Sequence, residues 1–147
     1  TENHPVIGMK VKRAVRYQGT KLIVIDPRKI DLVKYADIWL CQKPGTDVAV
    51  VNGLMNVIIT EGLYAKQYVE ERTENFDALK ATVEKYNPQY VEKISGIPAE
   101  DLIKAARLYA KAKRASGIAP MTAASTTLRR FTGRSRATSM GTSRSTT

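Results

Sequence analysis

The sequence predicts an α/β fold: a Rossmann-like parallel-sheet lobe with a helical extension and a disordered C-terminal tail. Two β-branched runs, at residues 21–25 and 37–41, alternate with helical patterns at 5–18 and 48–60. Strands that alternate with helices are typical of a parallel sheet in a layered α/β architecture. Residues 63–114 then show a series of short amphipathic patterns, which predict the helical extension.

Prolines and glycines punctuate the first half of the chain. Pro5 suits the first turn of the first helix, and Gly19 suits its end. Asp26-Pro27 ends the first predicted strand, and Pro44-Gly45 breaks the chain after the second. Between the strands, residues 30–36 fit either a short helix or an irregular connection.

A mainly apolar helix is predicted from Val48 to Thr60. Its apolar residues lie on every side, so we expect it to be buried. A side-chain oxygen of Thr46 or Asp47 is expected to cap its first turn by accepting from a free backbone amide. Gly62 is expected to end it.

A separate tail is predicted at residues 116–147, so the chain divides at about residue 115. The tail is rich in Ser and Thr, contains no acid, and has five arginines, which supply half of the net charge of +10. Such a composition cannot bury enough apolar surface to offset its ordering entropy. The concentration of charge in the tail weakens the case for nucleic acid as a partner, because no compact basic face is evident in the body of the chain.

Several classes of site are disfavoured by the residues present. A single cysteine, Cys41, excludes an internal disulfide, and its place in a strand-like run predicts a buried, inert thiol. His4 alone cannot make a metal site. No run of about 20 apolar residues indicates a membrane helix, and we expect a cytoplasmic protein. The start at Thr1, without methionine, suggests a trimmed or processed chain, or a piece of a longer one.

Two polar clusters, at residues 26–29 and 44–47, are the candidate ligand site. Each follows a predicted strand, and ligands of open α/β sheets bind at the carboxyl ends of strands. Gly45 allows close backbone approach, Asp47 can accept two N–H groups, and Arg28 offers a planar fork to phosphate or carboxylate. Local chemistry alone favours two ordinary turns, and neither a G-x-G-x-x-G nor a Walker A pattern is present.

Four motifs occur in order along the chain: T-E-x-H-P, I-D-P-R, K-P-G-T-D and G-I-P-A-E-D-L. With them, residues 1 to about 115 resemble the molybdopterin oxidoreductase family. Within it, the resemblance is to the catalytic alpha subunit of molybdenum- or tungsten-dependent formate dehydrogenases. It implies that the parent enzyme oxidises formate to carbon dioxide with a bis(molybdopterin guanine dinucleotide) cofactor.

The resemblance also implies a role for the candidate loops, which hold one guanosine end of the cofactor in that family. Asp26 is expected to contact ribose or guanine, Asp47 to accept guanine N–H groups, and Arg28 to contact phosphate or pack at the rim. Gly45 and Thr46 are expected to make backbone contacts. The full set of cofactor-binding residues implied is Thr1, Glu2, Asn3, Ile25, Asp26, Pro27, Arg28, Lys29, Gly45, Thr46 and Asp47.

Parts of the family pattern are missing from this sequence. The cysteines for the 4Fe–4S cluster and the metal-ligating Cys or selenocysteine with its adjacent His have no match, and neither Cys41 nor His4 takes that place. We therefore expect the remaining domains or subunits of the parent as partners, and no catalysis by this chain alone. A shift of reading frame or a mis-called gene end after about Ala115 is our hypothesis for the tail, and one uninterrupted frame at the locus would contradict it.

Two other functions stay open on the residues alone. The same two loops would serve a stand-alone module that binds an anion or a nucleotide without redox chemistry. The arginine-rich tail would serve a basic nucleic-acid-binding protein.

Overall fold

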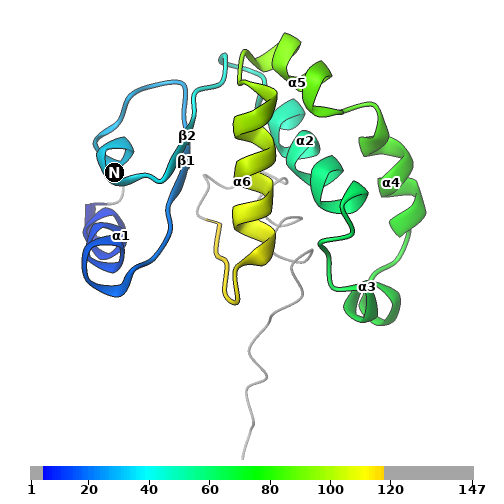
Figure 1. The fold of residues 1–147 in the computed structure, drawn as a ribbon, viewed down its shortest axis with the longest axis horizontal. Coiled ribbons are helices and arrows are strands. Elements are labelled where there is room, and N and C mark those ends of the chain that lie inside the picture. Colours follow the sequence, from blue (N-terminus) through cyan, green and yellow to red (C-terminus); the bar gives the residue numbers. More distant parts are fainter. Residues whose placement is uncertain (1–4, 118–147) are drawn as a thin grey trace, which may run out of the picture.

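The computed structural model of the protein describes residues 5–117. The chain forms a small parallel sheet with helices on both sides, which confirms the predicted α/β fold (Figure 1). Most of the predicted tail lies outside the described residues. Within residues 5–117, no helix is long and apolar enough to cross a membrane. The elements, in order, are α1 (Pro5–Gln18), β1 (Ile23–Ile25), η1 (Asp31–Tyr35, a 3₁₀ helix), β2 (Ile38–Leu40), α2 (Asp47–Thr60), α3 (Lys66–Arg72), α4 (Phe76–Glu84), α5 (Pro88–Ser95) and α6 (Ala99–Lys111).

The two strands are parallel, as predicted, and shorter than the runs that predicted them. They pair in the register Ile23 with Ile38, Val24 with Trp39 and Ile25 with Leu40. In Figure 1 the sheet lies between α1 with η1 on one side and the remaining helices on the other. Because the strands are parallel and in register, their carboxyl ends meet at one edge of the sheet.

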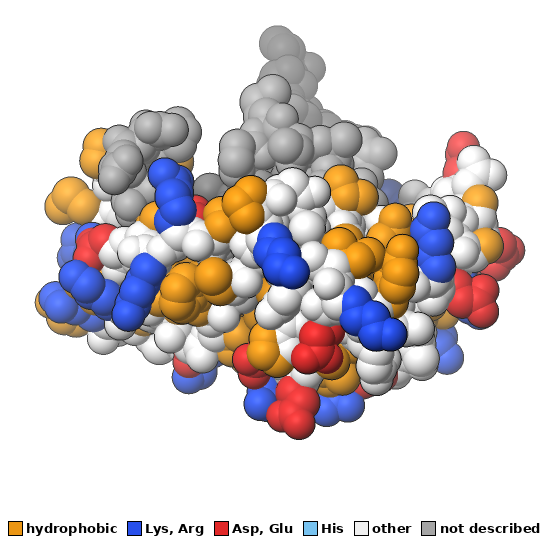
Figure 2. All heavy atoms as spheres, turned by 90° about the horizontal axis from the view of Figure 1, so that it is seen from above, with side chains coloured by type: hydrophobic (Ala, Val, Ile, Leu, Met, Phe, Trp, Pro, Cys, Tyr) orange, Lys and Arg blue, Asp and Glu red, His pale blue; other side chains and the backbone are white. Residues whose placement is uncertain are grey.

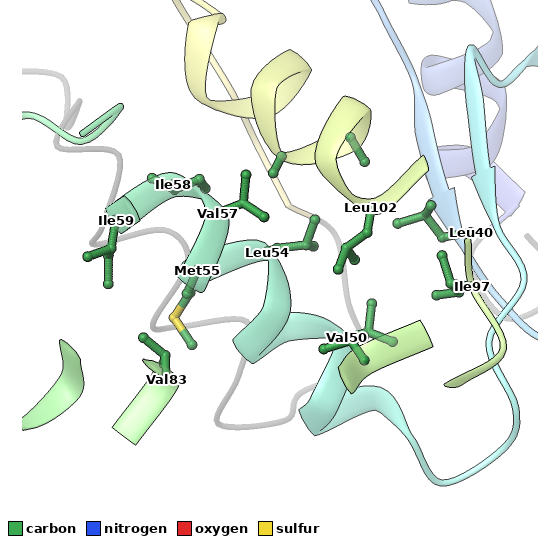
Figure 3. Packing of buried hydrophobic residues seen from close by; sticks show 13 residues of the cluster. Leu40, Val50, Leu54, Met55, Val57, Ile58, Ile59, Val83, Ile97 and Leu102 are labelled. Carbon is green, nitrogen blue, oxygen red and sulfur yellow. The ribbon is translucent and has the colours of Figure 1, made fainter. Parts of the chain in front are cut away.

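Helix α2 lies at the centre of the core, which confirms the prediction that it is buried. Its buried side chains meet residues of α4, α5, α6 and β2 (Figure 3). At one end of the core Leu102 of α6 lies beside Leu40, the last residue of β2 (Figure 3). The largest fully buried side chains are Leu40, Ile58, Ile97, Leu102, Val50, Val83, Val91 and Ser95. The helical extension and the sheet therefore share one core.

Asp37 fixes the start of both strands. Its carboxylate accepts hydrogen bonds from Lys21 Nζ at 2.7 Å and from the backbone N–H of Leu22 at 2.9 Å. Its own N–H donates to the Leu22 carbonyl at 2.8 Å. The hydrogen bond from Lys21, followed by the one from the Leu22 amide, lowers the pKa of Asp37. The ionised form of this side chain therefore stabilises the folded sheet.

We expect Asp37→Asn to reduce the loss of stability in acid. A carboxyl whose pKa is lower in the folded chain contributes stability above its unfolded pKa of about 3.9 and loses it as the pH falls through the folded pKa. Urea unfolding at pH 6 and at pH 3 should show a larger decrease for the natural chain than for the variant. Glu74→Gln, at an exposed position between α3 and α4, is the control. Equal decreases for the natural chain and Asp37→Asn would contradict the expectation.

Candidate functional site

The two candidate loops leave the same edge of the sheet, as the parallel strands require. The first loop follows β1 and the second follows β2. Two contacts from the end of β2 hold the first loop: Trp39 Nε1 donates to the Asp26 carbonyl at 2.9 Å, and Cys41 Sγ lies 3.6 Å from the Pro27 carbonyl oxygen. The two clusters therefore lie at one rim of the sheet, its carboxyl edge.

Within the first loop, the Asp26 carboxylate organises the backbone. Asp26 Oδ1 accepts from the Arg28 N–H at 2.8 Å and lies 3.5 Å from Arg28 Nε. The side chain of Asp26 is 22% exposed, whereas that of Arg28 is 76% exposed. Pro27 and Lys29 are exposed, and so is Ile25 at the end of β1. The loop thus presents one half-buried carboxylate and one accessible guanidinium at the rim.

The second loop is a tight turn that is tied to the helical extension. The Lys43 carbonyl accepts from Thr46 Oγ1 at 2.6 Å and from the Thr46 N–H at 3.3 Å. Gly45 adopts a φ of +83°, which only glycine adopts without strain. A β-carbon there would meet nothing within 4 Å, so the space beside the Gly45 α-carbon is open. The Lys43 N–H donates to the Ser95 carbonyl at 2.9 Å, which anchors the loop to the end of α5.

The prediction of a cap at Thr46 or Asp47 is right in position, but the expected hydrogen bond from the side chain is absent. Thr46 occupies the capping position, but its side chain makes no capping hydrogen bond. The hydroxyl instead turns back and closes the turn onto Lys43. Asp47 is the first residue of α2 itself. A carboxylate in the first turn is favoured by the positive end of the helix dipole, and the first amides of a helix have no partner within the helix.

The exposed Asp47 side chain has a hydrogen-bond partner, Gln42, that was not predicted from the sequence. Gln42 Nε2 donates to Asp47 Oδ1 at 3.1 Å. Gln42 is buried at 4% exposure. A signal for it exists in the sequence, because alternation along a strand places residue 42 on the same face as Leu40, which is fully buried. A glutamine at an inward position is a buried polar group and requires explanation.

Two further expectations need a correction or fall outside the described residues. Cys41 is exposed, so the prediction of a buried thiol is wrong. The strand ends at Leu40, and alternation turns the following side chain away from the core. Thr1, Glu2 and Asn3, predicted to bind cofactor, lie outside the described residues. Among residues 5–117, no group of three or more His, Cys, Asp and Glu side chains could hold a metal ion.

Comparison with known proteins identifies the family. The family model for molybdopterin oxidoreductases matches residues 1–142 of this chain. The chain belongs to the molybdopterin oxidoreductase family. The match extends past residue 115, and our division of the chain at that residue stays a prediction.

Proteins that are named as formate dehydrogenases align with most of this chain. The F420-dependent formate dehydrogenase subunit alpha of Methanocaldococcus jannaschii is 45% identical over 115 residues, which cover 78% of this chain and 17% of that protein. Formate dehydrogenase H of Escherichia coli is 43% identical over 115 residues, which cover 78% of this chain and 16% of that protein. The chain therefore spans less than a fifth of the length of these relatives.

A solved structure supports the same assignment. Acetylene hydratase from Pelobacter acetylenicus superposes with a TM-score of 0.79 and 35% sequence identity, over 87% of this chain and 19% of that protein. The names of these relatives cover two different reactions, a dehydrogenation and a hydration. This segment of the family fold is therefore compatible with more than one chemistry, as expected when function resides in sites rather than folds.

Proposed function

We propose that this chain is the part of a formate-oxidising molybdopterin enzyme that binds the guanosine end of molybdopterin guanine dinucleotide. Membership of the family implies a molybdopterin-type cofactor with molybdenum or tungsten. The observation that supports the guanosine site is the common rim formed by residues 26–29 and 44–47 at the carboxyl edge of the sheet. Ligands of open α/β sheets bind outside this edge.

The groups at the rim suit a guanine nucleotide. The Asp47 carboxylate can accept the N–H groups on the guanine edge, since an ionised carboxylate only accepts hydrogen bonds. We assign the ribose or guanine contact to Asp26, whose Oδ1 also accepts from the Arg28 N–H. The exposed Arg28 guanidinium suits a phosphate. The open backbone at Gly45 supplies a further contact, and we assign a backbone contact to Thr46 as well, although its N–H is bonded to the Lys43 carbonyl.

In this proposal the residues of this chain bind and orient the cofactor. The cofactor supplies the two-electron chemistry when bound, and such chemistry belongs to the cofactor rather than to the protein. Formate oxidation to carbon dioxide is proposed for the whole parent enzyme, on the likeness to formate dehydrogenase subunits. The remaining domains or subunits of that enzyme are the proposed partners, and the 4Fe–4S cluster and the metal ligand are assigned to them.

Asp47→Ala tests the guanosine site. The full chain, shown to be folded by circular dichroism, is titrated calorimetrically with GDP and with ADP. We expect tighter binding of GDP and a loss of about tenfold or more in GDP affinity for the variant, because hydrogen bonds to a charged acceptor contribute about 1.5–3 kcal/mol. Asp77→Ala is the matched control, since Asp77 is also an exposed acid in the first turn of a helix, α4. A folded chain that binds GDP no better than ADP would contradict the proposal.

A titration of the same chain with duplex DNA tests the alternative that it binds nucleic acid. Figure 2 shows Lys and Arg side chains spread over the face in view, interspersed with hydrophobic and acidic side chains. Such a surface gives no continuous track for a phosphate backbone. Binding of a random duplex that weakens steeply with salt would favour the nucleic-acid alternative instead.

A further inference from the structure

Gln42 is a buried amide whose two ends differ in their surroundings. Its Nε2 donates to Asp47 Oδ1 at 3.1 Å, at the rim where the second loop meets α2. Its Oε1 is buried and has no hydrogen-bond partner within the part of the chain that the structure describes. Gln42 is therefore half satisfied, although it is 96% removed from solvent.

This arrangement is unfavourable for the fold alone. A buried acceptor without a partner carries a desolvation penalty, which an apolar side chain of similar shape would not carry. The amide cannot resolve the conflict by turning over, because Oε1 would then face the Asp47 carboxylate, which is also an acceptor. Packing therefore does not explain a glutamine at this position.

The position of Gln42 in the fold allows it to restrict the movement of the Asp47 side chain. Two residues before it, Leu40 is fully buried in the core. One residue after it, the Lys43 N–H is bonded to the Ser95 carbonyl of α5. A donor fixed to the core in this way restricts the rotation of the exposed Asp47 side chain. One hydrogen bond uses one of about four acceptor positions of a carboxylate, so both oxygens can still accept from a ligand.

We propose that Gln42 is a positioning residue that orients the Asp47 carboxylate toward the N–H groups of a guanine base. The inference rests on the proposed guanosine site and deepens it. Gln42 acts through Asp47 and does not itself touch the nucleotide. When the Asp47 carboxylate is already oriented before binding, less side-chain entropy is lost as the ligand binds. Gln42 therefore raises both the affinity and the selectivity for guanine.

The test is the variant Gln42→Met, which keeps the length of the side chain and removes the amide. Calorimetric titration of the full chain with GDP should show an affinity about threefold to tenfold lower, and the preference over ADP should decrease. The melting temperature should change little, because the gain from removing the unpartnered oxygen offsets the loss of the hydrogen bond to Asp47. In an Asp47→Ala background, Gln42→Met should change GDP affinity no further, since the group that it positions is absent.

The outcomes separate this inference from the function on which it rests. GDP affinity unchanged in Gln42→Met, with selective binding by the natural chain, would overturn the positioning role and leave the guanosine site standing. Additive losses in the double variant would also overturn it, since Gln42 would then contact the nucleotide directly. A lower melting temperature together with weaker binding would assign Gln42 to the fold. A natural chain that does not prefer GDP would overturn the site and the inference together.

Discussion

Leu102→Ala is expected to lower the free energy of unfolding by about 2–5 kcal/mol. Leu102 of α6 is 0% exposed and belongs to the cluster that joins α2, α5, α6 and β2. Truncation removes buried methyl groups and leaves a cavity, and neighbours held in three helices and a strand have little freedom to collapse into it. Urea or thermal unfolding followed by circular dichroism measures the change.

Leu108→Ala is the matched control for this substitution. Leu108 has the same side chain and lies on the same helix, but it is half-buried and outside the buried cluster. Both substitutions replace Leu by Ala in the same helix, so they change the helix propensity equally. The difference between the two losses of stability therefore reports burial. Equal losses of stability in the two variants would contradict the assignment of Leu102 to the centre of the core.

The same core supports the candidate site. Leu40 ends β2 inside the cluster, and the chain then passes through Gln42 to the turn at Gly45. The Ser95 carbonyl at the end of α5 accepts from the Lys43 N–H, so the second loop is fastened to the helical extension as well as to the sheet. Loops on such a rigid support can hold ligand groups in place, because few torsions remain free. We therefore expect the helical extension to matter for nucleotide binding although it lies outside the two loops.

Much of this architecture was predictable because local chemistry and tertiary structure agree. Pro5 begins α1, Asp26-Pro27 follows β1, and the apolar run after Asp47 forms the buried α2. Helix boundaries marked by proline or glycine depend on backbone constraints that operate within a few residues. The parallel pairing followed from the alternation of strands and helices, and the common rim followed from the pairing.

The predictions that failed depend on where side chains turn in three dimensions. Cys41 lies one residue past the end of β2, so it faces outward although its run reads as a strand. Threonine often caps helices, but the Thr46 hydroxyl donates to the Lys43 carbonyl instead of accepting from an amide of α2. The role of Gln42 was not predicted because it depends on a hydrogen bond across the turn to Asp47. Residue type alone does not decide between such competing partners.

Gly53→Val is expected to lower the free energy of unfolding by about 3 kcal/mol, at the upper end of the usual cost of overpacking. Gly53 is buried in the middle of α2. A β-carbon at Gly53 would lie 2.8 Å from Val91 Cγ2 and 3.0 Å from Leu102 Cδ2. Val91 is fully buried and β-branched, so its methyl group cannot rotate away freely. Glycine normally weakens a helix, and here it allows α2 to approach α5 and α6 closely.

The Val91→Ala background provides the control for Gly53→Val. Removal of Cγ2 from Val91 opens the space that the new side chain needs, so the same substitution should cost less in that background. Chemical unfolding of the natural chain, both single variants and the double variant measures the coupling, which we expect at about 0.5–3 kcal/mol for residues in contact. Strict additivity would show that Gly53 and Val91 do not meet, and would contradict the close packing of α2 on α5.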